Sequence, residues 1–301
     1  MNLPLSQRNI LGDFDLKSLY ESALLEAEPT DVQNEIIELL KGERNVDTLR
    51  SICELMPVKK FESYESDALV KRARWRVKRL ENACESVFED KKFNVLEIGC
   101  GRGEMLSALM EKFDAQCVGL DPVDSLFVNN RKEAPELYDA MMVKGVAEDI
   151  PFCEENFDLI LGYNSMEHFF DPKLVVKESL RVLKPGGTMY FWFGPPFNGP
   201  FGPHLHHRIT LPYFHHFFSE DVVTEFLGVE GDPYVGKNQW STNSFRELFT
   251  KKNELNCIYY LEEYVWDHLW IVRAFPDVFS EFSPSELVIR AIEVACVKAD
   301  K

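Results

Sequence analysis

The residues whose types and spacing most clearly indicate a binding site are Glu97 and the three glycines that occupy every second position from Gly99 to Gly103. The acid lies within a short apolar run, Val95–Ile98, which predicts a buried strand. Glycine lacks a Cβ, so the backbone at such a turn can take positive φ and approach a ligand closely. With a helix predicted over Glu104–Phe113, this is the first strand–turn–helix of a nucleotide-binding α/β fold.

The detail of this turn argues against a dinucleotide. A dinucleotide fingerprint is G-x-G-x-x-G, and Glu104 stands where its third glycine belongs. Glu97 would be repelled by a pyrophosphate and attracted by a cationic amino acid. The pattern therefore favours a ligand with a positive group and no phosphates, and it disfavours a nicotinamide dehydrogenase. An ordinary tight turn is the alternative that the glycines alone leave open.

A second acid ends the next predicted strand, Gln116–Leu120. Asp121 follows the glycines by about twenty residues, the place from which an acid hydrogen-bonds ribose hydroxyls. Its alternative role is to cap a helix over Val123–Asn129. Both roles remain open from the residues alone.

The chain then continues with strand and helix signals in alternation. A strand is predicted at Phe157–Asn164, followed by a helix that Asp171 caps and Pro172 begins. That helix is expected to run to about Leu183, where Lys-Pro-Gly-Gly stops it before a strand at Thr188–Phe193.

In this order the motifs resemble a known family. They are E-I-G-C-G-R-G, G-L-D-P, A-E-D-I-P-F, F-D-L-I, S-M-E-H and R-V-L-K-P-G-G. Together, over about residues 90–195, they resemble the class I S-adenosylmethionine-dependent methyltransferases, and most of all the ubiquinone-biosynthesis-like "type 11" branch. The resemblance implies a Rossmann-like seven-stranded sheet with helices on both faces. An N-terminal helical region and a cap or insertion after the fifth strand would be additions to it.

The resemblance also implies S-adenosylmethionine as cofactor and assigns roles by position. Glu97 would face the methionine amino group, directly or through water. Gly99, Cys100 and Gly101 would let the backbone lie against the methionine moiety, and Asn164 would border the sulfonium.

The other end of the cofactor would lie at the next two strands. Asp121 would bind the ribose hydroxyls. Asp149, with its neighbours Ala147 and Glu148, would lie at the adenine.

Length and pattern suggest how the rest of the 301 residues is divided. Helices are predicted near Leu16–Glu26, Val32–Leu40 and Val46–Leu55. We expect a helical N-terminal cap and linker over 1–64 and the cofactor-binding core over 65–228. An aromatic-rich cap or insertion would fill 229–285, and the final core strand 286–301. The N-terminal helices are a candidate surface for homo-oligomers.

Charge and composition bound the partners. The net charge of −17 argues against nucleic acid, whose binding depends on Lys and Arg. The segment Lys71–Arg79 holds six basic residues in nine. We interpret it as a helix beside the cofactor site, with a nucleic-acid patch as the alternative. One of its arginines is a candidate for the cofactor carboxylate.

The location expected from the sequence is the cytoplasm. No apolar stretch reaches the ~18–20 residues that span a bilayer, so stable membrane insertion is not expected. No secretion signal is evident, and the seven scattered cysteines contain no C-x-x-C pair, which is typical of reduced thiols.

Histidines offer the candidate catalytic chemistry. Five of the seven fall within thirteen residues, in a loop region rich in glycine, proline and aromatic residues. They are His204, His206, His207, His215 and His216. His204 is one candidate base, and His168, soon after Asn164, is the other. A structural role and a metal site are the alternatives for the cluster, and the spacing matches no familiar ligand pattern, so no metal is predicted.

The predicted function is methyl transfer to a small molecule or glycan. A hydroxyl acceptor, whose proton a histidine would remove, is favoured over nitrogen or carbon. The alternative is a non-catalytic cofactor-binding partner or regulatory subunit, because intact cofactor motifs report binding alone.

Overall fold

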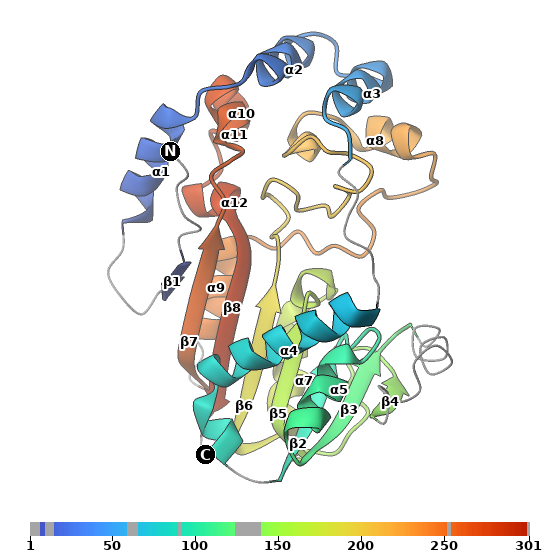
Figure 1. Cartoon of the computed structure of the whole chain (residues 1–301), viewed down its shortest axis with the longest axis vertical. Helices are drawn as coiled ribbons and strands as arrows, with labels where there is room; N and C mark the ends of the chain where they lie inside the picture. Colours follow the sequence, from blue (N-terminus) through green and yellow to red (C-terminus); the bar gives the residue numbers. More distant parts are fainter. Residues whose placement is uncertain are drawn as a thin grey trace. The chain divides into compact units, whose positions relative to one another are not determined.

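The computed structural model describes residues 7–9, 15–58, 66–89, 92–123, 140–251 and 254–299. Its central feature is an eight-stranded sheet with the strand order β1-β7-β8-β6-β5-β2-β3-β4 (Figure 1). Seven of these strands are those expected of the Rossmann-like fold, and the three-residue β1 (Gln7–Asn9) is added at the edge beside β7. None of the described helices has both the length and the apolarity to cross a bilayer.

Five strands run parallel and bring their carboxyl ends to one edge of the sheet. They are β2 (Phe93–Ile98), β3 (Ala115–Asp121), β4 (Met141–Lys144), β5 (Phe157–Tyr163) and β6 (Leu183–Phe193). β2 and β5 are apolar and almost wholly buried, as strands covered on both faces must be. Ligands of such folds bind at this edge, where the loops diverge.

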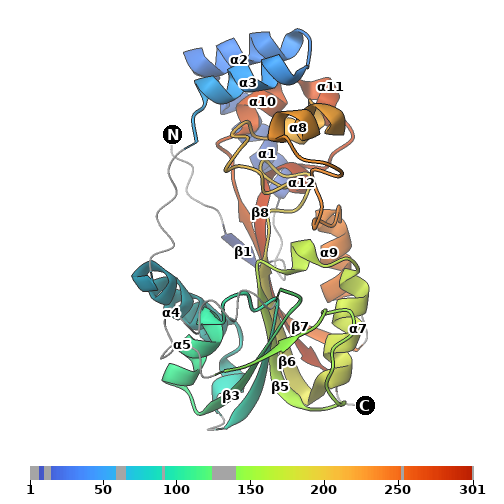
Figure 2. The same cartoon turned by 90° about the vertical axis from the view of Figure 1, so that its right-hand side faces the viewer.

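Helices cover both faces of this part of the sheet. Figure 2 shows α4 and α5 on one side of it and α7 and α9 on the other. Their bounds are Ser66–Ala83 for α4, Glu104–Lys112 for α5, Pro172–Val182 for α7 and Thr242–Thr250 for α9. Short 3-10 turns, η1 (Glu85–Glu89) and η3 (Met166–His168), follow α4 and β5. A single apolar core joins α4 and α5 to β2 and β5.

Local sequence signals explain where the helices begin. Asp171 accepts the N–H groups of Lys173 and Leu174, and Pro172 occupies the first turn of α7, as predicted. The predicted helix from Glu104 is confirmed as α5, and the basic segment Lys71–Arg79, predicted to be helical, lies within α4. The helix expected at Val123–Asn129 lies, after its first residue, outside the described residues.

The chain forms two compact units, which divide it differently from the expected boundaries. One, here called the sheet unit, comprises 62–193, 245–261 and 292–301. The other, here called the helical unit, comprises 1–61, 194–244 and 262–291. The segment 194–228, expected in the core, therefore belongs to the helical unit, together with the expected N-terminal cap.

The helical unit gathers three segments that are far apart in sequence. The predicted N-terminal helices are present as α1 (Leu16–Glu26), α2 (Asp31–Lys41) and α3 (Val46–Leu55). Arg273 donates to the carbonyl of Leu25 at 2.7 Å and pairs with Glu28, which ties α1 to the later helices. Those helices are η4 (Phe214–His216), α8 (Glu220–Leu227), α10 (Leu269–Ala274), α11 (Pro276–Phe279) and α12 (Pro284–Val288).

Three local expectations were wrong. Leu255–Tyr264 is β7, a strand of the sheet and not part of a cap, and its alternating exposure is that of an outer strand. Lys-Pro-Gly-Gly does not precede β6 but lies inside it, in an irregular start where Gly186 has φ +73°. The sequence Ser-Phe-Arg-Glu from Ser244 has the pattern of a capping box and predicts a helix that begins there. The helix α9 instead begins at Thr242, and Ser241 accepts the N–H of Ser244. The last strand is present as β8 (Ile289–Lys298), antiparallel to β6.

Candidate active site at the carboxyl edge of the sheet

The glycine turn after β2 has the backbone that only glycine adopts easily. Gly99, Gly101 and Gly103 have φ values of +69°, +52° and +79°. A Cβ on Gly99 would lie 2.7 Å from the Cβ of Ser165, so this glycine allows β2 and the loop after β5 to touch. A Cβ on Gly101 would meet nothing within 4 Å. The turn is thus tight on one side and open at Gly101.

The N–H groups of this turn are already used within the protein. Gly99 and Cys100 both donate to the carbonyl of Leu120, at 2.8 and 3.3 Å. Gly101 donates to Asp121 Oδ2 at 2.9 Å, and Gly103 to the carbonyl of Cys100 at 2.8 Å. A phosphate-binding turn instead aims several such groups at its ligand. The geometry therefore supports the prediction that the ligand carries no phosphate here.

Glu97 is a buried carboxylate beside the turn. It is 3% exposed, and its Oε2 atom makes no hydrogen bond within the described part of the chain. Burial, followed by the neighbouring charge of Glu104, raises its pKa well above the usual range, which the Arg76 guanidinium partly opposes. A buried carboxylate without enough partners is costly, and a cationic ligand would supply one.

Arg76 brings a positive charge to the same place from α4. Its guanidinium lies over the ring of Tyr163, 4.8 Å from the centroid. Burial lowers its pKa, and the charge of Glu97 raises it. Among the described residues it forms no ion pair within 4.0 Å, although Glu97 is close enough to act on it. A half-buried guanidinium and a buried carboxylate thus face a common region, as an amino acid zwitterion requires.

Asp121 links β3 to the glycine turn and to the residues that follow β3. Oδ2 accepts the N–H of Gly101, and Oδ1 accepts the N–H of Val123, both at 2.9 Å. Each carboxylate oxygen can accept a second hydrogen bond, so the residue can still bind hydroxyl groups. It is 8% exposed, which fits a residue at the rim of a site.

The loop after β4 carries the three residues predicted at the adenine. Ala147 is buried, Glu148 half-buried and Asp149 exposed. Glu148 Oε1 accepts the N–H groups of Phe170 and Asp171, at 2.8 and 3.3 Å, which joins this loop to the start of α7.

A clamp on α7 holds the residues that follow Asp149. Arg181 donates to the carbonyls of Ile150 and Phe152, both at 2.8 Å, and pairs with Glu178. Glu178 in turn accepts the N–H of Ile150 at 3.2 Å. The conformation of the loop after β4 is therefore fixed by α7, the helix that follows β5.

The end of β5 places Asn164 at the same edge. Its φ of +50° is unusual for a residue with a side chain, and its N–H donates to the carbonyl of Trp192 at 2.9 Å. Its side chain is exposed. Cys100, also predicted here, instead packs inward: it is buried, and a Cβ on Gly119 would lie 2.6 Å from its Sγ. Only its backbone remains to contact a ligand.

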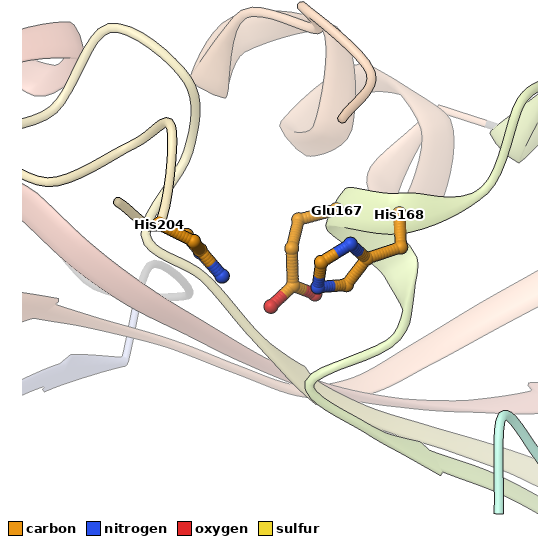
Figure 3. Close-up of side chains that lie close together, drawn as sticks. All are labelled: Glu167, His168 and His204. Carbon is orange, nitrogen blue, oxygen red and sulfur yellow. The ribbon is translucent and has the colours of Figure 1, made fainter. Parts of the chain in front are cut away.

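Glu167 and His168 follow on η3. A carboxylate oxygen of the buried Glu167 and a ring nitrogen of the exposed His168 lie within 4.8 Å of each other. Figure 3 shows the two side chains. A carboxylate beside an imidazole stabilises the imidazolium that forms when the ring takes up a proton.

The five clustered histidines all belong to the helical unit, including His204. No three of them, among the described residues, bring ligand atoms within 4.8 Å of one another. His215 and His216 stack with centroids 4.1 Å apart, and burial lowers the pKa of both. Nε2 of His216 lies 3.3 Å from the carbonyl of Asn198. Both rings therefore pack within the helical unit.

Aromatic residues of the histidine-rich loop region pack into the helical unit itself. Tyr213, Phe214 and Phe217 are at most 5% exposed. Tyr213 donates to the carbonyl of Leu287 at 2.6 Å. They form a core because rings of this size stabilise a unit built mostly of short helices and loops.

Sequence reasoning missed three contributors to the site. Arg76 could not be told from its five basic neighbours, although it alone combines helical spacing toward the buried Ala73 and Val77 with a position facing Glu97. Ser165 has no signal except its place in the S-M-E-H motif. Arg181 opens the R-V-L-K-P-G-G motif, and this regularity was its only signal.

Comparisons with known proteins identify similar sequences for the central part of the chain. Residues 96–191 match the family described as "Methyltransferase domain". Tocopherol O-methyltransferase of Arabidopsis thaliana is 39% identical over 105 residues, which cover 34% of this chain and 30% of that protein. A ubiquinone biosynthesis O-methyltransferase of Idiomarina loihiensis is 32% identical over 117 residues, covering 37% of this chain and 45% of that protein.

The solved structures agree on the fold. A Galdieria sulphuraria structure described as a sarcosine dimethylglycine methyltransferase superposes with a TM-score of 0.50 at 16% identity, covering 77% of this chain and 87% of that one. The matched segments span less than half of the length of either curated relative. Residues 96–191 of this chain thus match a methyltransferase domain of the type 11 branch, and the sheet that contains them has the fold of S-adenosylmethionine-dependent methyltransferases.

Proposed function

We propose that this chain transfers the methyl group of S-adenosylmethionine to an oxygen of a small molecule or glycan. The observation that carries the proposal is the placement of Glu97 and Arg76 at a glycine turn whose own N–H groups are already used. The buried carboxylate of Glu97, which has an oxygen without a hydrogen-bond partner, fits the amino group of the cofactor. The half-buried guanidinium of Arg76 fits its carboxylate. When bound, the cofactor supplies a methyl group already activated on a sulfonium.

The residues of the sheet unit would bind and orient the reactants. Glu97 and Arg76 would hold the methionine end, and the open face at Gly101 would let the backbone lie against it. Asp121 would accept hydrogen bonds from the ribose hydroxyls with the lone pairs not used by Gly101 and Val123. Alignment of this kind is worth about 7–11 kcal/mol of the barrier in favourable cases.

The remaining site residues would serve the two ends of the cofactor. Ala147, Glu148 and Asp149 would border the adenine, held by the Arg181 clamp. Asn164, at the tip of β5, would border the transferred group.

A base is needed when the acceptor is a hydroxyl. The bound cofactor would supply the methyl group to the acceptor oxygen, and a ring nitrogen of a histidine would take up the acceptor proton. His168 is the first candidate, because it follows the tip of β5 and has the carboxylate of Glu167 beside it. His204, in the helical unit, is the second. General-base catalysis of this kind contributes about 10²–10⁴ in rate.

The relatives support an oxygen acceptor. Tocopherol O-methyltransferase and the ubiquinone biosynthesis O-methyltransferase are named for oxygen methylation. A fatty-acid O-methyltransferase of Mycolicibacterium smegmatis, 35% identical over 112 residues, is another. The similarity lies in the cofactor-binding part, so it supports the reaction class and leaves the acceptor to experiment.

The test uses the purified full chain and S-adenosylmethionine with a radiolabelled methyl group, supplied with phenolic, carboxylic and sugar hydroxyl acceptors. We expect a labelled product with at least one acceptor class. His168→Gln should keep cofactor binding and lose about 10²–10⁴ of turnover, with His204→Gln as the parallel variant. Unchanged turnover in both would exclude a histidine base. A chain that binds the cofactor but transfers its methyl group to none of these acceptors, nor to any component of a cell extract, would instead favour a non-catalytic partner subunit.

A further inference from the structure

A network of buried polar side chains on β8, β6 and β5 reaches the backbone of Arg76. Glu293 on β8 is 1% exposed and accepts the hydroxyl of Tyr190 on β6 at 2.6 Å. The hydroxyls of Tyr190 and Tyr163, the latter on β5, lie 2.9 Å apart. Tyr163 also donates to the backbone carbonyl of Arg76 at 2.9 Å. Three neighbouring strands thus connect to one turn of α4.

The chain of contacts closes on the same helix. Glu293 also forms an ion pair with Arg79, three residues after Arg76. α4 is therefore attached at two points on one face, through the Arg76 carbonyl and the Arg79 guanidinium. Two attachments one turn apart fix both the rotation and the axial position of the helix.

The ring of Tyr163 adds a third restraint, on the side chain of Arg76 itself. The guanidinium stacks over this ring at 4.8 Å from its centroid, and the ring is held between Tyr190 at 5.5 Å and Trp192 at 6.1 Å. An arginine side chain has many rotamers, and holding it in one before a ligand arrives removes an entropic cost of binding.

Burial of such groups needs a reason beyond stability. Burial raises the pKa of both tyrosines, so they stay protonated and act as hydrogen-bond donors. Replacing a buried ionic network by apolar residues is often neutral or stabilising. This network ends on the backbone carbonyl of Arg76 and on the ring that lies under its guanidinium, which is the arrangement expected if it fixes the position of Arg76.

We propose that Tyr163, Tyr190 and Glu293 are positioning residues that hold Arg76 against the glycine turn, and so set the affinity of the chain for the carboxylate of its cofactor. This inference rests on the proposed function. These residues do not touch the reacting atoms, and they act through Arg76.

The experiment measures dissociation constants by calorimetry for S-adenosylmethionine and for decarboxylated S-adenosylmethionine, which lacks the carboxylate. Tyr163→Phe removes one hydroxyl and keeps the ring under Arg76. We expect it, Tyr190→Phe and Glu293→Gln each to weaken S-adenosylmethionine binding by about tenfold. Arg76→Gln should weaken it by about tenfold to a hundredfold. Affinity for the decarboxylated compound should stay within about twofold in all four.

The control is Arg74→Gln on the same helix. Arg74 pairs with Glu111 on α5 at 2.7 Å, and both side chains are more than half exposed. Its loss should leave both dissociation constants unchanged. Tyr163→Phe added to Arg76→Gln should cause no further loss, because the hydroxyl acts through the arginine.

The outcomes separate the two proposals. A wild-type chain that binds neither compound overturns the proposed function and this inference with it. If Arg76→Gln weakens binding and the Tyr163, Tyr190 and Glu293 variants do not, the cofactor site stands and the positioning role is wrong. Equal losses for both compounds would show a merely structural role. Should Glu293→Gln fail to fold, Tyr163→Phe alone carries the comparison.

Discussion

Asp121 Oδ2 accepts the N–H of Gly101 at 2.9 Å, and this hydrogen bond joins a side chain at the tip of β3 to the glycine turn after β2. The same carboxylate accepts the N–H of Val123 through Oδ1. It therefore shapes both loops between which the ribose would lie. The helix-capping and ligand-binding roles that the sequence left as alternatives are compatible in one residue.

Asp121→Ala should reduce both stability and cofactor affinity. The substitution leaves two backbone donors at a buried site without their acceptor, which costs about 1–3 kcal/mol each if no water replaces it. We expect a loss of about 2–4 kcal/mol in the free energy of unfolding, measured by denaturant titration. Calorimetry should show S-adenosylmethionine affinity reduced by more than about tenfold.

Asp158 offers the matched control for this variant. Its carboxylate also accepts a backbone N–H, from Asn94 at 2.8 Å, and pairs with Lys184, but it lies at the opposite ends of the strands. Asp158→Ala should therefore lower stability and leave cofactor affinity unchanged. Equal losses of affinity in the two variants would argue that Asp121 acts only through stability.

Alanine substitutions at Gly99 and Gly101 should affect stability and cofactor binding to different extents. Gly99→Ala combines a φ of +69° with a Cβ that would lie 2.7 Å from Ser165, so it should destabilise the chain by about 2–4 kcal/mol. Gly101→Ala adds a Cβ in open space at φ +52°, which should cost only about 1–2 kcal/mol. We expect Gly101→Ala nevertheless to abolish cofactor binding, because the methyl group would occupy the open side of the turn.

Thermal unfolding and calorimetry on the same samples check this pair. Ser165→Gly added to Gly99→Ala should restore part of the stability, since it removes the side chain that the new Cβ meets. Retention of full affinity by Gly101→Ala would show that the ligand does not lie against the turn.

The sequence predicted the sheet unit well because each of its elements has a local cause. Apolar runs, glycine turns and the Asp171–Pro172 cap lie next to the structure they produce, and α1, α2 and α3 were likewise predicted to within about a residue. The seven-stranded sheet was expected from the resemblance alone, because periodicity does not determine which strands are neighbours.

The features that the sequence did not predict depend on contacts between residues far apart along the chain. Nothing near Tyr213 indicates that its hydroxyl meets the carbonyl of Leu287, 74 residues later. The joining of α1 to the helices after residue 262 through Arg273 is equally invisible in a local pattern. β7 was mistaken for part of a cap because the segment is rich in aromatic residues, whereas it pairs within the sheet. For the same reason Arg76 emerged only once α4 was placed against β5.

Cofactor binding should release a proton from Glu97. Burial raises its pKa in the folded chain well above the usual value of 4.5, which favours the protonated side chain before a ligand binds. A bound ammonium group favours the ionised form, and the proton then leaves. At pH 6 the amino group of the cofactor is already protonated and takes none up. Calorimetric enthalpies in buffers of different ionisation enthalpy should reveal the release, and Glu97→Gln should abolish it.

Glu97 should also make the stability of the ligand-free chain fall with rising pH. A group whose pKa is raised in the folded state contributes stability below its unfolded pKa and loses it as pH rises toward the folded value. Glu97→Gln removes this loss, so at pH 7 the variant should unfold at a higher temperature than the wild type while binding S-adenosylmethionine more weakly. A variant less stable than the wild type at pH 7 would indicate that Glu97 is ionised and satisfied without a ligand.

The helical unit should be acid-sensitive through His268. Burial lowers the pKa of this histidine to about 4, and its ring packs edge-on against Phe201 at 5.0 Å. The unfolded chain, with an ordinary histidine pKa of about 6.5, binds the proton more readily. Stability is therefore complete above pH 7 and is lost as pH falls from about 6.5 toward 4, with a loss of about 2 kcal/mol at pH 5.

His268→Gln should flatten this dependence, and His207→Gln, at an exposed histidine of the same unit, should not. Denaturant titrations of the three proteins at pH 5 and pH 7.5 give the comparison. The pH difference in the free energy of unfolding should be about 2 kcal/mol smaller in His268→Gln than in the other two. If all three lose the same stability, His268 gains a partner on protonation and its burial does not govern acid unfolding. The neighbouring Asp267, whose charge opposes the effect of burial on the His268 pKa, is the group that would then supply it.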